Sequence, residues 1–110
     1  MKIEITNEWE AFMQERFPIL KRVEKAIYDS YMISMEDMRG KRLFPHIFFA
    51  RVIFAHICEK EVRPSIYLAS YLNRDHATLN YWRKQYINLT DSACAEFKDM
   101  EADVIRYLNL

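Results

Sequence analysis

Glycine is almost absent from this chain, in which Gly40 is the single one. A phosphate-binding loop of the Gly-x-x-x-x-Gly-Lys-Ser/Thr type needs glycines so that its backbone can approach a nucleotide, and no such string occurs. The sequence therefore excludes an ATPase built on that loop. Proline is also scarce, with three residues, whereas leucine, isoleucine and aromatic residues are frequent. This composition favours helices over a turn-rich sheet.

Cysteines are few in this sequence, and long apolar runs are absent. Cys58 and Cys94 each fall on an apolar stripe, where a free cysteine behaves as a small buried hydrophobe, so we expect core thiols and no disulfide. No window approaches the ~18 consecutive apolar residues of a membrane-spanning helix. No basic start is followed by the apolar run of a secretion signal. We therefore expect a cytoplasmic protein with no membrane partner.

Arrangements of catalytic or metal-binding residues are missing as well. Asp75 and His76 are adjacent, so they project from a helix in different directions, and no serine or cysteine is placed to use them. His46, His56 and the two cysteines show no recognised ligand spacing. The sequence predicts a protein that is not an enzyme and that has no metal site or cofactor.

Charge is balanced in total but unevenly distributed. Residues 1–38 hold five Lys or Arg against eight Asp or Glu, residues 39–84 hold nine against three, and residues 85–110 hold two against five. The central segment thus carries an excess of +6, each flank carries −3, and all three histidines lie in the centre. A segregated positive field of this kind steers a protein onto a polyanion such as DNA.

Apolar residues at helical spacing predict one all-α domain over residues 1–110, compact and built from five to six helices. Trp9, Phe12, Met13 and Phe17 define a first helix that ends at Pro18. Ser34 and Asp37 form a capping box for a short helix that ends near Gly40. The remaining expected segments are a helix over 19–31, a loop over 41–47, a central buried helix over 48–60, and a last helix from Cys94 to Leu108 begun by Asp91 or Ser92.

A helix-turn-helix is predicted over residues 64 to about 88. Pro64 and Ser65 open a short helix, Asn73 turns the chain, and Asp75 is a good N-cap for the helix that follows. Arg74 to Leu79 then places a cation, a carboxylate, an imidazole and a hydroxyl at the start of that helix. In a helix-turn-helix this first turn enters the major groove, where short polar side chains meet bases and phosphates.

These residues resemble a known family. The run from 19 to 108 is similar to the C-terminal DNA-binding domain of the bacterial replication initiator DnaA, whose signature is an Arg-Asp-His-Thr-Thr-hydrophobic string. Tyr31 to Met38 resembles the helix and turn that enter that domain, Lys41-Arg42 the start of its basic loop, and Ala50-Arg51 an Ala-Arg pair on its central helix. Residues 1–18 form an extra helix outside the resemblance. We interpret the chain as the DNA-reading module of such an initiator without its ATPase.

The resemblance implies that the protein binds double-stranded DNA and that different residues provide affinity and specificity. Asp75 is expected mainly to cap the helix, with base contact as an added role, and His76 to contact DNA or, alternatively, to lie on a plain surface. Arg51 is expected either to contact a phosphate or to form an internal ion pair. Lys41 and Arg42 are expected either to clamp a phosphate or to form a solvated turn. The candidate DNA-binding residues are Lys41, Arg42, Arg51, Arg63, Ser65 and Arg74 for phosphates, and Asp75, His76, Thr78 and Tyr81 for bases.

Three departures from the family pattern favour an alternative. Ala77 replaces the first threonine of the signature, Leu43-Phe44-Pro45 follows the two loop cations where the family is richer in arginine, and Trp82 occupies an inward position that is small in the family. The alternative is a protein–protein interaction module that has lost or weakened DNA binding, with a protein partner or a homodimer formed through the first helix. Tyr67, Tyr71 and Tyr81 are expected as an exposed or half-buried aromatic set on such a surface.

Overall fold

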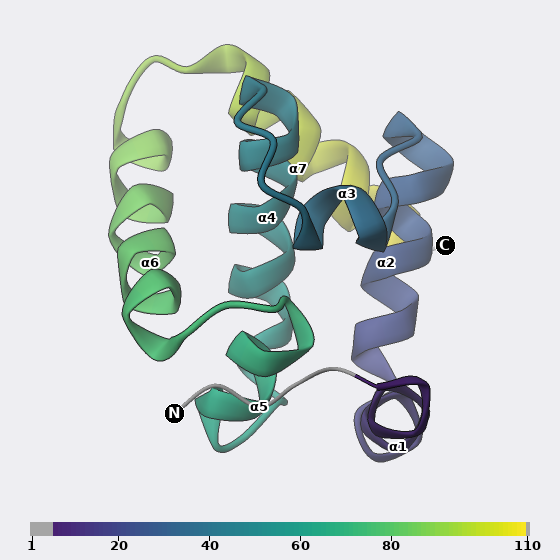
Figure 1. Ribbon diagram of the computed structural model, residues 1–110. Coiled ribbons are helices and arrows are strands. Elements are labelled where there is room, and N and C mark those ends of the chain that lie inside the picture. The colour runs from purple at the N-terminus through teal and green to yellow at the C-terminus, as the bar shows by residue number, and fades with distance from the viewer. Residues whose placement is uncertain (1–5, 110) are drawn as a thin grey trace.

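Residues 6–109 are described by the computed structural model, and within them every regular element is a helix (Figure 1). The all-α class is confirmed. The described residues form seven helices, and each matches a helical segment named from the sequence, so the expected number of five to six was too low. Residues 1–5 and 110, which we assigned to the same domain, lie outside the described part. The helices are α1 (Asn7–Arg16), α2 (Ile19–Tyr31), α3 (Met35–Arg39), α4 (Pro45–Cys58), α5 (Ser65–Tyr71), α6 (His76–Asp91) and α7 (Ala95–Leu108).

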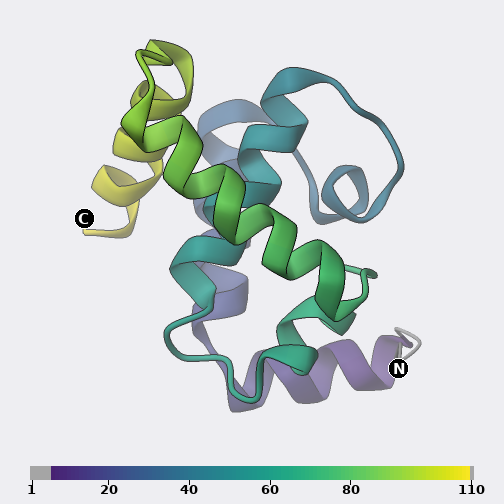
Figure 2. The same cartoon turned by 90° about the vertical axis from the view of Figure 1, so that its left-hand side faces the viewer.

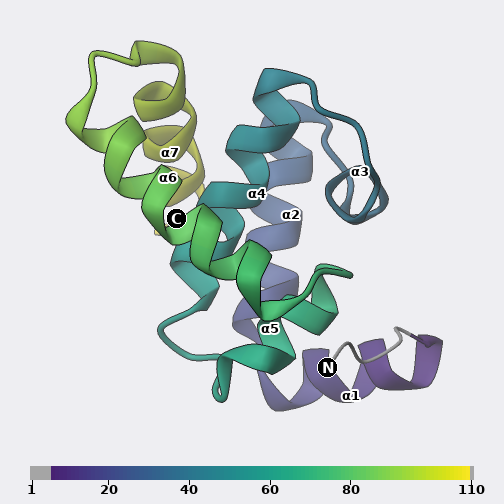
Figure 3. The same cartoon turned by 60° about the vertical axis from the view of Figure 1, so that its left-hand side comes forward.

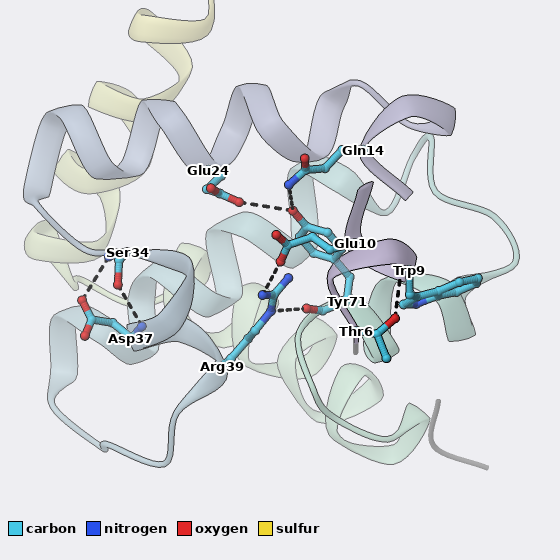
Figure 4. Close-up of polar contacts among 9 residues, drawn as sticks. All are labelled: Thr6, Trp9, Glu10, Gln14, Glu24, Ser34, Asp37, Arg39 and Tyr71. Carbon is cyan, nitrogen blue, oxygen red and sulfur yellow. Dashed lines mark hydrogen bonds and ion pairs between the residues drawn. The ribbon is translucent and has the colours of Figure 1, made fainter. Parts of the chain in front are cut away.

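Local sequence signals set several helix starts. The capping box at α3 is confirmed: the Ser34 hydroxyl accepts from the Asp37 backbone N–H at 3.0 Å, and the Asp37 carboxylate accepts from the Ser34 N–H at 3.0 Å (Figure 4). These bonds lower the pKa of Asp37. Our loop over 41–47 is too long, because Pro45 begins α4. Proline suits the first helical turn, where its missing N–H would have no partner.

The boundary between the last two helices also differs from the prediction. We ended the helix that follows the turn near Asn88 and began the last one at Asp91 or Ser92, but α6 continues to Asp91 and α7 begins at Ala95. The Ser92 backbone N–H donates to the Asn88 carbonyl at 3.0 Å, and its hydroxyl donates to the Leu89 carbonyl at 3.1 Å. Ser92 therefore satisfies carbonyls at the end of α6 and closes that helix.

Helix α4 is the centre of the domain, as predicted. It contacts α2, α3, α6 and α7, and Figure 1 shows it between α6 on one side and α2 on the other. Its Ile53 and Phe54 are fully buried, and the Phe54 ring stacks on Tyr71 with 6.2 Å between ring centroids. Cys58 is buried and free, and burial raises the pKa of its thiol. Cys94 is free and half-buried.

The extra helix α1 packs behind α5 and α2. The Trp9 ring lies edge-on to Tyr67 with 5.7 Å between centroids. Gln14 Nε2 donates to the Tyr71 hydroxyl at 2.9 Å, as Figure 4 shows. Our expectation of three surface tyrosines is wrong for Tyr71, which is fully buried, whereas Tyr67 is half-buried and Tyr81 is 52% exposed. Desolvation raises the pKa of Tyr71. Helix α1 is thus part of the fold that supports α5.

None of the helices within residues 6–109 is both long and apolar enough to cross a membrane.

The attachment of α6 to the core can be tested on the helix itself. Leu79 is fully buried, so Leu79→Ala removes apolar contacts and leaves a cavity, and we expect a loss of about 2–5 kcal/mol in the free energy of unfolding. Ile87, on the same helix, is 58% exposed, so Ile87→Ala serves as the control and should change stability by less than about 0.5 kcal/mol. Urea denaturation followed by circular dichroism measures both, and equal losses would contradict the packing described.

Candidate nucleic-acid interface

Two helices joined by a four-residue turn, α5 and α6, form the candidate interface. Asn73 has φ 57°, a left-handed conformation that asparagine tolerates better than most residues, so its predicted role in turning the chain is confirmed. The Arg74 backbone N–H donates to the Ala69 carbonyl at 2.8 Å, and the Asn73 N–H donates to the Ser70 carbonyl at 2.9 Å. These bonds end α5 and redirect the chain so that α6 begins at His76.

Helix α6 runs across one face of the molecule, and Figure 2 shows it as the foremost helix on that face. Its inward residues Leu79 and Trp82 are buried, as predicted, at 0% and 3% exposure. Along its first two turns, the side chains exposed to solvent include His76, Ala77 and Tyr81. The leading end of α6 therefore presents an accessible strip that can enter a groove.

Asp75 caps the start of α6, which confirms the predicted role. Its Oδ1 accepts from the Thr78 backbone N–H at 2.9 Å and from the Thr78 hydroxyl at 3.0 Å. The cap fixes the first turn, and it uses the hydroxyl proton of Thr78, whose oxygen can still accept a hydrogen bond. A base contact by Thr78 would therefore be through acceptance or through its methyl group.

Ser65 and His76, both candidate DNA contacts, lie together across the two helix starts. The distance from Ser65 Oγ to His76 Nε2 is 2.9 Å. Ser65 is half-buried at the first turn of α5, while His76 is exposed. The hydroxyl thus orients the imidazole from the neighbouring helix. Helical spacing does not predict this pairing, because the two residues are eleven positions apart and lie on different helices.

Arg51 is the largest correction to the candidate set. Its side chain is 3% exposed, which rules out the phosphate contact, and it forms no ion pair among residues 6–109. Its guanidinium instead donates to four backbone carbonyls, those of Asp37 at 3.2 Å, Met38 at 2.8 Å, Gly40 at 2.8 Å and Arg42 at 2.7 Å. Burial, and then the charge of Arg74, lower the pKa of Arg51.

Arg74, which we expected to contact phosphate, also turns inward. Its guanidinium donates to the carbonyl of Arg39 at 2.8 Å and to the Gly40 carbonyl, and it lies over the Trp82 ring at 5.9 Å from the centroid. Burial lowers its pKa. Arg74 therefore ties the turn before α6 to the end of α3. Its side chain is half-buried, and its contact with phosphate stays a prediction.

The positive field of residues 39–84 is consequently carried by fewer side chains than the sequence count suggested. Arg39 pairs with Glu10 and Arg83 pairs with Glu59, while Arg51 and Arg74 bind carbonyls. The exposed cations of this segment are Lys41 and Arg42 in the loop before α4, Arg63 before α5, and Lys60 and Lys84. The bonds from Arg51 and Arg74 to Gly40 hold that loop next to the turn that precedes α6.

In the part of the chain that the structure describes, no group of three or more His, Cys, Asp or Glu could hold a metal ion. No protein-family model matches the chain, and no curated protein or solved structure resembles it closely enough to count as a match.

The role of Arg51 can be measured against its neighbour Arg42. Arg51→Met keeps most of the side-chain volume but leaves four carbonyls without their donor, so we expect a loss of about 2–4 kcal/mol in the free energy of unfolding. Arg42→Met, at an exposed position, removes the same charge and should cost less than about 0.5 kcal/mol. Thermal and urea denaturation decide between them. A loss of equal size in both variants would show that the buried bonds do not stabilise the fold.

Proposed function

We propose that this protein binds double-stranded DNA with a sequence preference, using α5 and α6 as a helix-turn-helix similar to that of the DnaA C-terminal domain. The single observation that carries the proposal is the leading end of α6. There an exposed imidazole, held by Ser65, lies beside a capped first turn on a helix that crosses an open face (Figure 2). A cytoplasmic location and a role in replication or transcription control belong to the same proposal.

The geometry supports a division between affinity and specificity. The exposed loop cations Lys41 and Arg42, with Arg63 before α5, lie outside the helix and suit contacts to phosphate oxygens, which position a protein without reading sequence. His76 and Thr78 on α6 suit contacts to base edges in the major groove, which do discriminate between sequences. The backbone N–H groups at the start of α6 add a favourable field for phosphate.

The phosphate-binding role of the loop predicts a change in salt dependence. Replacing both Lys41 and Arg42 by alanine removes two cations, so binding to all duplex sequences should weaken and the slope of log K against log salt should fall by about 1–2 units. Lys21 and Lys25 are exposed on α2, and replacing both by alanine is the charge-matched control, which should leave the slope unchanged. Fluorescence anisotropy at several salt concentrations measures it. An unchanged slope in the loop variant would refute the role of the loop.

The base-reading role of α6 predicts a different signature for His76. His76→Ala should reduce binding to a selected site by about 5- to 100-fold, the range of one good base contact, while binding to random DNA changes little. Asn88→Ala, at an exposed position near the other end of α6, is the control and should leave both affinities intact. Selection from random duplexes supplies the site. If His76→Ala lost the same affinity for selected and for random DNA, His76 would not contribute to sequence specificity.

One observation favours the alternative, a protein-interaction module. Leu43 is 84% exposed and Phe44 is 56% exposed, and both follow the loop cations where the DnaA-like pattern is richer in arginine. Exposed apolar side chains of this size next to a proposed DNA surface are typical of protein-binding sites. A gel shift with a duplex pool separates the two functions, because salt-dependent retardation supports DNA binding and its absence at low salt supports a protein partner or a second copy.

A further inference from the structure

A groove of about 500 Å³ lies alongside the first two turns of α6, between that helix, α4 and the loop before α4. Its apolar lining comes from Leu43, Pro45, Phe48, Phe49, Tyr81 and Trp82. The Phe48 and Tyr81 rings lie 6.4 Å apart between centroids, which places one aromatic wall on α4 and the other on α6. This volume falls within the usual range for pockets that hold a small molecule, about 300–1,000 Å³.

Two positive charges line the same groove. Arg51 and Arg74 both contribute to its lining, and both donate to the Gly40 carbonyl, so the two guanidiniums are close together. No carboxylate lines the groove, and neither arginine pairs with one among residues 6–109.

Such a pair of desolvated cations is unusual, because a buried charge is costly unless an opposite charge or strong dipoles compensate it. Here every hydrogen bond that the two guanidiniums donate within residues 6–109 goes to a backbone carbonyl. The net charge beside the aromatic walls therefore stays positive. An anion that reached this point would gain charge-assisted hydrogen bonds and relieve the repulsion between the two guanidiniums.

We propose that this groove binds a small organic anion with an aromatic ring, such as an aromatic carboxylate or sulfonate. The ring would pack against the wall that Phe48 and Tyr81 form together, and the anionic group would point to Arg74, which is half-buried and so more accessible than Arg51. The apolar walls would bind the ring, and the two arginines, which have no carboxylate partner among residues 6–109, would bind the anionic group. A neutral aromatic molecule would contact only the walls.

Occupation of the groove would affect α6 directly. Thr78 and Tyr81 line the groove and also belong to the strip that we propose faces DNA. A bound anion would place negative charge beside the leading end of that helix and weaken its attraction for phosphates. This consequence depends on the proposed function, whereas binding of the anion does not.

Two fluorescent probes with the same ring system test the inference on the full chain. Anilinonaphthalene sulfonate carries an anionic group, and phenylnaphthylamine is its neutral counterpart. We expect saturable one-to-one binding of the sulfonate and at least about tenfold weaker binding of the neutral probe, which lacks the charge-assisted bonds. Equal affinity of the two probes would overturn the proposal, because it would mean that only the apolar walls bind.

Substitutions at the exposed rim locate the probe without disturbing the core. Leu43 is 84% exposed, so Leu43→Asp and Leu43→Asn both lose the leucine and differ in one negative charge. We expect Leu43→Asp to bind the sulfonate about threefold more weakly than Leu43→Asn at low salt, and the two variants to bind the neutral probe equally. Arg74→Met, checked for folding by circular dichroism, should weaken binding of the sulfonate by about tenfold or more. Sulfonate binding that is the same in Leu43→Asp and Leu43→Asn would place the probe elsewhere and refute the site.

A gel shift with and without the sulfonate separates this inference from the proposed function. Loss of the DNA complex as the probe saturates the groove would support the proposed link between them. Probe binding by a protein that never retards DNA would support the groove and contradict DNA binding. DNA binding that the saturating probe leaves unchanged would overturn the regulatory consequence.

Discussion

The Arg51 guanidinium donates hydrogen bonds to four backbone carbonyls beside α4. They gather the end of α3 and the following loop onto the central helix α4. The loop has no regular structure of its own, so without these bonds its carbonyls would have to find water or another donor. Arg74 binds one of the same carbonyls, that of Gly40, and thereby fixes the turn before α6 to the loop. Two parts of the chain more than thirty residues apart become one surface.

This surface gives the proposed function its physical basis. The exposed cations Lys41 and Arg42 are placed beside the leading end of α6, where Asp75 caps the helix and Ser65 orients the ring of His76. The acidic helix α7 meets α6 at the other end of that helix, across the short connection that follows Asp91 (Figure 3). The acidic side chains of α7 therefore lie at the far end of α6, whereas the acidic helix α1 packs against α5, nearer to the leading end. The cations that a polyanion would meet at the leading end are Lys41 and Arg42.

Two residues that depart from the DnaA-like pattern, Leu43 and Trp82, line the same groove. Trp82 is buried and lies under Arg74, so the large ring supports the cation that holds the loop. Leu43 is the rim of an apolar groove rather than a solvated link between cations. Both residues line the groove beside α6, where we propose that a second ligand binds.

Sequence reasoning predicted those parts of the fold whose partners are close in the chain. The Ser34–Asp37 capping box, the left-handed Asn73 and the Asp75 cap each involve residues within three positions of one another, so composition and spacing were sufficient. It did not predict the roles of Arg51 and Arg74. An arginine side chain carries no sign of which backbone carbonyls the folded chain will bring to it.

Tyr71 and Ser65 illustrate the same limit. Tyr71 is buried because α1, some sixty residues earlier, covers it and supplies Gln14 to its hydroxyl. Ser65 meets His76 only because the turn folds one helix start onto the next. Helical periodicity predicts which face of a helix is apolar, but it does not predict which side chain a neighbouring helix will bring to its edge.

We propose that the leading end of α6 and the cationic loop before α4 form a single DNA-binding surface. The most direct measurement is an NMR titration of the nitrogen-labelled protein with short duplex DNA at low salt. If the two parts bind DNA as one surface, the amide shifts of Lys41, Arg42, Ser65 and residues 76–81 change together, and the changes disappear as the salt concentration is raised. Shifts confined to α2 and α7, or none at low salt, would contradict it.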